Sequence, residues 1–95
     1  MQVKELNKSI AKKTIILYVL KILYNGSSKE KPITIKQITN VINALGVPCD
    51  RKTVSRNLEY MMEFGLPVYK IRGGGCYYNH NKPEMDLFQI KKGEN

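Results

Sequence analysis

Apolar side chains recur at helical spacing in three stretches of the chain. The first stretch runs from about residue 9 to residue 24 and is apolar around most of its circumference, which predicts a helix that is covered from more than one side. Such a helix is either the central core helix or a core helix that also forms a dimer face. The second stretch covers residues 35–45 and the third covers residues 51–64, both with the narrower apolar face of a helix packed on one side.

Polar residues and glycines mark where these helices begin and end. Thr34 is followed three positions later by Gln37, the spacing of a capping box, and Asp50 fits the cap of the third helix. Only residues 47–49 separate the second helix from the third, which is the pattern of a helix-turn-helix. The helices are expected to end at three glycines: Gly26 as a left-handed cap, Gly46 and Gly65.

The pattern changes after Pro67, which bars further helix. Residues 68–71 (V-Y-K-I) and 76–79 (C-Y-Y-N) are rich in aromatic and β-branched side chains, as strands are. Glycines 73–75 join them in a tight hairpin, and residues 32–34 suggest a short extended piece. The predicted fold class is therefore α+β, mainly α: a winged helix-turn-helix with three helices and a two-stranded β-hairpin wing.

A chain of 95 residues forms one domain. We expect the winged helix-turn-helix to occupy residues 1–82. Residues 83–95 form a short C-terminal tail that is weakly amphipathic through about residue 91. This tail is predicted to be a short helix or a strand, and it is a candidate dimerisation segment.

The net charge of the chain indicates what kind of partner it binds. A net charge of +8 predicts attraction to a polyanion, which could be nucleic acid, an anionic membrane surface or an acidic protein. Lysine supplies thirteen of the sixteen positive side chains. The three arginines, whose planar fork matches phosphate and guanine edges, are confined to the third helix and the hairpin: Arg51, Arg56 and Arg72.

Charges are sorted along the third helix. Its first two turns are basic and carry hydroxyl groups, whereas Glu59 and Glu63 lie in its last two turns. Because DNA phosphates repel carboxylates, the N-terminal half is the half that would enter a groove. The alternative is an amphipathic helix with a solvated face, on which Lys52 and Arg56 pair with the two glutamates along the helix; of these pairs, Arg56 and Glu59 have the favourable i,i+3 spacing.

Each candidate contact follows from the chemistry of its side chain. Arg56 and Ser55 are best suited to base edges, Lys52 and Thr53 to bases or phosphate, and Arg51 at the helix start to a phosphate. On the wing, Lys70 and Arg72 would reach the minor groove or the flanking backbone. The candidate DNA-binding residues are Arg51, Lys52, Thr53, Ser55, Arg56, Lys70, Arg72 and Gly74.

The sequence gives little support for metal binding, disulfide bonding or catalysis. Cys49, Cys76 and His80 fall short of the four ligands of a structural zinc site, and two cysteines make no disulfide framework. Neither a catalytic triad nor a phosphate loop is present in the sequence, so no catalytic residue, metal, cofactor or small-molecule ligand is expected. Of the adjacent Tyr77 and Tyr78, one ring should enter the core. No signal peptide or membrane-length apolar run is present, which predicts a cytoplasmic protein with reduced thiols.

From about residue 15 to residue 79 the chain resembles the N-terminal winged-helix domain of bacterial WYL-type transcriptional regulators, within the DeoR-like group. The similar segments are I-T-I-K-Q-I, C-D-R-K-T-V-S-R-N-L, F-G-L-P-V and G-G-G-C-Y-Y. The resemblance implies that the third helix binds the major groove. Asn57 departs from the Asp usual in the family. Residues 83–90 resemble the start of the family's connecting helix, and the sequence stops where the ligand-sensing domain would begin, as expected of either a naturally minimal protein or a fragment.

Two functions remain open at this point. The first is a small transcriptional regulator of double-stranded DNA, a repressor in preference to an activator, acting as a homodimer through its N-terminal segment or its tail. The second is an inhibitor or adaptor encoded by a phage or mobile element, for example of the anti-CRISPR type. Such a protein would use the same scaffold to bind a protein partner that handles nucleic acid, and fold alone does not separate the two.

Overall fold

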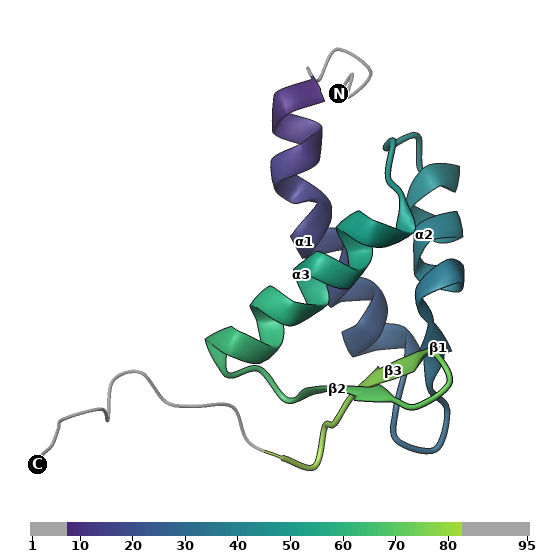
Figure 1. The fold of residues 1–95 in the computed structure, drawn as a ribbon, viewed down its shortest axis with the longest axis vertical. Coiled ribbons are helices and arrows are strands. Elements are labelled where there is room, and N and C mark those ends of the chain that lie inside the picture. The colour runs from purple at the N-terminus through teal and green to yellow at the C-terminus, as the bar shows by residue number, and fades with distance from the viewer. Residues whose placement is uncertain (1–7, 83–95) are drawn as a thin grey trace, which may run out of the picture.

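The structure, a computed structural model, describes residues 8–82 of the chain, with side chains described from Lys13 onward. Three helices are followed by a β-hairpin, which forms two strands of a small antiparallel sheet (Figure 1). The order of elements is α1 (Lys8–Gly26), β1 (Ile33–Thr34), α2 (Ile35–Ala44), α3 (Arg51–Phe64), β2 (Val68–Ile71) and β3 (Gly75–Tyr78). The predicted class, α+β and mainly α with winged helix-turn-helix topology, is confirmed.

The sheet has three strands in the order β1-β3-β2, not the two of a simple hairpin. In the hairpin, Val68 pairs with Tyr78 and Ile71 pairs with Gly75. The short extended piece before α2 adds β1 to the other edge of β3, with Ile33 opposite Cys76. Since β1 leads directly into α2, this pairing ties the start of the second helix to the wing.

Side-chain caps set the N-terminal boundaries of α2 and α3, and a glycine ends α3. The Thr34 hydroxyl accepts a hydrogen bond from the Gln37 N–H at 3.0 Å, and the Gln37 side chain accepts one from the Thr34 N–H at 2.9 Å, which completes the predicted capping box. Asp50 caps α3 by accepting from the Thr53 N–H at 2.8 Å. Gly65 ends α3 in the left-handed conformation, as predicted.

The predicted left-handed cap at Gly26 is wrong. Gly26 is the last residue of α1 and is not among the glycines with positive φ. The end of α1 is held instead by Ser27, whose backbone N–H and hydroxyl both donate to the Leu23 carbonyl, at 3.1 and 2.7 Å. The same hydroxyl accepts from the Tyr78 N–H at 3.0 Å. A bond from β3 therefore satisfies this helix end, which removes the need for the glycine conformation.

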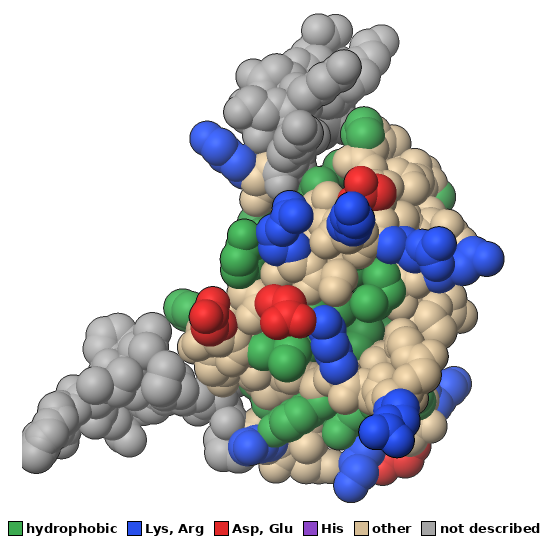
Figure 2. Space-filling view, in the orientation of Figure 1, with side chains coloured by type: hydrophobic (Ala, Val, Ile, Leu, Met, Phe, Trp, Pro, Cys, Tyr) green, Lys and Arg blue, Asp and Glu red, His purple; other side chains and the backbone are tan. Residues whose placement is uncertain are grey.

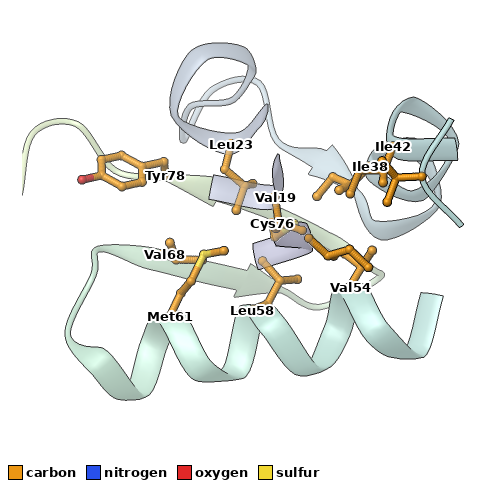
Figure 3. Packing of buried hydrophobic residues seen from close by; sticks show 12 residues of the cluster. Val19, Leu23, Ile38, Ile42, Val54, Leu58, Met61, Val68, Cys76 and Tyr78 are labelled. Carbon is orange, nitrogen blue, oxygen red and sulfur yellow. The ribbon is translucent and has the colours of Figure 1, made fainter. Parts of the chain in front are cut away.

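One core joins the three helices to the sheet. In α3, Val54, Leu58 and Met61 are buried, as the helical spacing predicts, and they point toward α1 and the hairpin (Figure 3). This packing leaves the opposite side of α3 open to solvent. The buried hydrophobic side chains are Ile15, Val19, Leu23, Ile38, Ile42, Val47, Val54, Leu58, Met61, Val68, Cys76 and Tyr78.

The predictions for the C-terminal tail, a short helix or strand in residues 83–95 and its use as a dimerisation segment, lie outside the described residues.

Candidate nucleic-acid interface

The N-terminal half of α3 presents its basic side chains to solvent. Val54 anchors this half of the helix in the core, and Arg51, Lys52 and Arg56 are exposed around it. Ser55 is half-buried, on the side of the helix that faces the wing. Figure 2 shows Lys and Arg side chains spread over the face on which α3 lies, with a few acidic side chains scattered among them. The charges predicted to be sorted along α3 are therefore exposed in that order, with Arg51, Lys52 and Arg56 in the first two turns and Glu59 and Glu63 in the last two.

An open groove of about 480 Å³ lies between the start of α3, the start of α2 and the tip of the wing. Three positively charged side chains line it: Lys36, Arg51 and Lys52. No acidic side chain is among the residues that line this groove. Its remaining lining residues are Thr34, Ile35, Ser55, Gly73 and Gly74. The groove therefore brings together three segments that are well separated along the chain.

Asp50 is the acid nearest to the start of α3, and its carboxylate forms the N-cap of that helix. Hydrogen bonds from Thr53 lower the pKa of the Asp50 carboxyl, and the nearby charges of Lys52 and Arg56 lower it further. The carboxylate stays ionised and caps the first turn, where the partial positive charge of the helix end favours an anion. The backbone N–H of Thr53 is thus already bonded to the Asp50 carboxylate, and the Thr53 side chain is half-buried.

Lys70 of β2 binds α3 across the gap between the wing and the helix. Its ammonium group lies 2.6 Å from the Glu59 carboxylate and 3.4 Å from the Ser55 hydroxyl. The alternative pairing of Glu59 with Lys52 or Arg56 along the helix is not found among the described residues. Arg56 forms no ion pair with any described residue. Its guanidinium is left available to a ligand.

The wing tip is a tight turn formed by Arg72, Gly73 and Gly74. Both glycines have positive φ, 101° and 104°, which is the conformation that side chains with a Cβ adopt least readily. The Gly74 N–H donates to the Ile71 carbonyl at 3.1 Å. Gly75, which we expected in the turn, is the first residue of β3. The tip therefore places Gly74 on the groove wall and leaves Arg72 exposed beside it.

The structure thus brings only half of the predicted contact residues into one groove: Arg51, Lys52, Ser55 and Gly74. Arg56 lies outside the groove lining on the exposed side of α3, Arg72 is exposed at the wing tip, and Lys70 is held by Glu59. Sequence reasoning missed Lys36. Its position two residues after the capping Thr34 was visible in the sequence, but the pairing of β1 with the wing that carries it to the groove was not.

The two thiols have no reactive setting. Cys76 is fully buried, which raises its pKa to about 11, and its thiol donates to the Ile33 carbonyl at 3.3 Å. Burial, and then the charge of Asp50, raise the pKa of Cys49. Because the thiolate is the nucleophile, neither residue is poised for chemistry at neutral pH.

The paired tyrosines divide as predicted. Tyr78 is buried in the core, whereas Tyr77 is half-buried and stacks on Tyr69 across the hairpin, with ring centroids 5.5 Å apart. Within residues 13–82, no group of three potential metal ligands comes together. None of the helices within residues 8–82 is long and apolar enough to span a bilayer.

No family model, curated protein or solved structure matches this chain. The resemblance to the winged helix of WYL-type regulators stays a prediction.

Proposed function

We propose that this protein binds double-stranded DNA and regulates transcription, with repression as the favoured outcome. The observation that carries the proposal is the groove in which Lys36, Arg51 and Lys52 converge from two helix starts beside the wing tip. Positive side chains converging beside a recognition helix fit a phosphate backbone, whose neutralisation supplies most non-specific affinity. The resemblance to WYL-type regulators points the same way.

The contacts divide into positioning and reading. Lys36, Arg51 and Lys52 neutralise neighbouring phosphates of the DNA backbone beside the major groove. Arg56 reads a base edge from the exposed side of α3, because a guanidinium can bond guanine O6 and N7 together. Arg72 at the wing tip reaches the flanking backbone or minor groove.

The orientation of α3 follows from its acids. Glu63 lies in the last turn of the helix, and Glu59 is neutralised by Lys70. An N-terminal approach to DNA keeps Glu63 farthest from the phosphates, and the ion pair limits the repulsion from Glu59. Binding at a promoter in this way excludes other proteins from the same duplex, which is the simplest route to repression. Such a protein would act where the genome is, in the cytoplasm of a bacterial or phage-infected cell.

The proposal is tested by selection of bound duplexes from a random pool with the 95-residue chain, followed by sequencing. A reader with one base-contacting arginine in a helix should enrich a short motif that contains at least one invariant G·C pair. Recovery of an unbiased pool at every salt concentration would contradict sequence-specific regulation.

A second prediction concerns Lys70 and Glu59. Lys70→Ala should weaken binding to all duplexes by similar factors, because it leaves the Glu59 carboxylate uncompensated on the face of α3. Glu59→Gln should strengthen binding and steepen the salt dependence by about one unit of slope, because it frees Lys70 for a phosphate.

Lys70 can act by neutralising Glu59 or by contacting DNA itself, and the double variant Lys70→Ala/Glu59→Gln distinguishes these two roles. Fluorescence anisotropy gives the Kd of each variant for a duplex. If Lys70 acts by neutralising Glu59, the double variant binds close to the wild-type level, since one charge of each sign is removed. A double variant as weak as Lys70→Ala alone would mean that Lys70 itself contacts DNA. Glu63→Gln makes the same change of charge without a lysine partner and serves as the control.

A further inference from the structure

Residues 45–50 join the end of α2 to the start of α3 (Figure 1) and set how the two helices lie relative to each other. Gly46 turns the chain in the left-handed conformation, with a φ of 91°. The Val47 N–H then donates to the Ile42 carbonyl at 3.3 Å, and the Val47 side chain is buried in the core. These contacts hold the first half of the turn, up to Val47.

The side chain of Asn43 holds the second half of the turn. Its Nδ2 group donates to the Cys49 carbonyl at 3.1 Å, and its Oδ1 atom accepts from the Cys49 N–H at 3.0 Å. Both backbone polar groups of one residue are thus bonded to one side chain, because an amide carries a donor and an acceptor on separate atoms. We name this pair of hydrogen bonds the Asn43 clamp.

The clamp lies directly before the basic residues of α3. Cys49 is followed by Asp50, which caps α3, and then by Arg51 and Lys52, which line the basic groove. The first buried residue of α3 is Val54, so residues 51–53 have no fully buried side chain to anchor them. The start of the helix is therefore positioned by the turn that precedes it, and the Asn43 clamp holds that turn at its C-terminal end.

We infer that Asn43 is a positioning residue for DNA binding: the clamp fixes the start of α3 so that Arg51 and Lys52 face the same groove as Lys36. Asn43 is not among the residues that line the groove, so it acts through the backbone of the turn and not by touching DNA. The inference rests on the proposed function, but its structural part, that Asn43 holds the turn, is measurable without DNA.

A fixed start of α3 favours binding because the contact residues are ordered before DNA arrives. If the turn moved freely in the unbound chain, DNA would have to order it, and this loss of conformational entropy would reduce the affinity. The clamp is exposed to solvent, so its loss should shift equilibria by the modest factor of an exposed hydrogen bond, roughly three- to tenfold, and leave the fold intact.

Asn43→Ala removes the clamp without changing the net charge. Alanine has a higher helix propensity than asparagine, so the substitution does not weaken α2. Asn79→Ala is the matched control, because the Asn79 side chain also bonds the backbone: it accepts from the Asn81 N–H at 3.0 Å, after β3 and outside the groove. Circular dichroism verifies that both variants are folded.

The rate at which Cys49 reacts with an aromatic disulfide reagent measures the turn without DNA. Cys49 is half-buried within the turn, whereas Cys76 is fully buried and reports on global unfolding. Asn43→Ala should raise the rate at Cys49 roughly three- to tenfold and leave the rate at Cys76 unchanged, and Asn79→Ala should change neither. An unchanged rate at Cys49 in Asn43→Ala overturns the inference.

Duplex binding at a temperature where every variant is folded measures the effect on the groove. Asn43→Ala should raise the Kd roughly three- to tenfold and reduce the salt slope, because fewer phosphates are neutralised together; Asn79→Ala should do neither. A clamp that served stability alone would lower the Tm and leave the Kd and the slope unchanged, and that result overturns the inference.

Failure of the clamp and failure of DNA binding give different results. A wild-type chain that binds no duplex contradicts the proposed function and with it the positioning role of Asn43. Failure of the inference alone leaves a wild-type chain that binds duplex DNA with a steep salt slope and an Asn43→Ala chain that binds it equally well.

Discussion

Replacing Arg56 by alanine should cost roughly 1–3 kcal/mol of affinity for the preferred duplex and flatten the sequence preference at one position. Arg56 is exposed on α3 and has no ion-pair partner among the described residues, so the loss is one of DNA contact and not of a contact within the fold. Competition binding of the selected duplex and its single-base variants measures both effects.

Arg56→Lys is the matched control for this prediction. It keeps the positive charge but loses the planar fork, so it should retain most of the non-specific affinity and still lose base discrimination. If both substitutions reduced the affinity for every duplex by the same factor, Arg56 would be a phosphate contact and the proposed division of roles would be wrong.

Leu58→Ala should lower the free energy of unfolding by about 2–5 kcal/mol. The Leu58 side chain is fully buried where α3 faces α1 and the hairpin (Figure 3), and the groove forms only when these elements pack. Single domains have a total free energy of unfolding of about 5–15 kcal/mol, so this one substitution removes a large share of the stability of the fold. Urea unfolding followed by circular dichroism measures the difference.

The control for Leu58 is Tyr60→Ala on the same helix, where the side chain is 51% exposed. That change should cost less than about 1 kcal/mol, as surface substitutions do. Equal losses for the two variants would contradict the placement of the core face of α3. The urea dependence should keep the same slope in both, because neither change alters the surface that unfolding exposes.

The sequence predicted local features well because their causes are local. The bounds of α3 follow from Asp50 and Gly65, which act within one turn of the helix ends. Gly26 failed as a cap because Ser27 donates both its N–H and its hydroxyl to the Leu23 carbonyl, and that hydroxyl is in turn held by the N–H of Tyr78, 51 positions from Ser27 along the chain. A capping rule that considers only neighbouring residues has no means of including such a contact.

The sequence predicted which basic residues of α3 belong to the candidate site, but not the long-range contacts that bring the other residues beside them. The basic first turns of α3 were visible from charge order alone. Lys36 reaches the groove because β1 pairs with β3, a contact between segments more than forty residues apart along the chain. Likewise, the i,i+3 spacing along the helix offered Arg56 as the partner of Glu59, whereas Lys70, eleven positions away, binds Glu59 from the wing.

Duplex DNA should bind in the groove lined by Lys36, Arg51 and Lys52. The most direct test is the salt dependence of duplex binding by the wild-type chain and by two variants of equal net charge. One variant carries Lys36→Gln and Arg51→Gln in the groove, and the control carries Lys21→Gln and Lys82→Gln outside it.

For the wild type, the log of the binding constant should fall linearly with the log of salt concentration, with a slope of about −3 to −5 for four or five neutralised phosphates. The groove variant should lose about two units of that slope and the control none. A wild-type slope near zero, no duplex binding at low salt, or equal losses in the two variants would contradict the account and favour a protein partner.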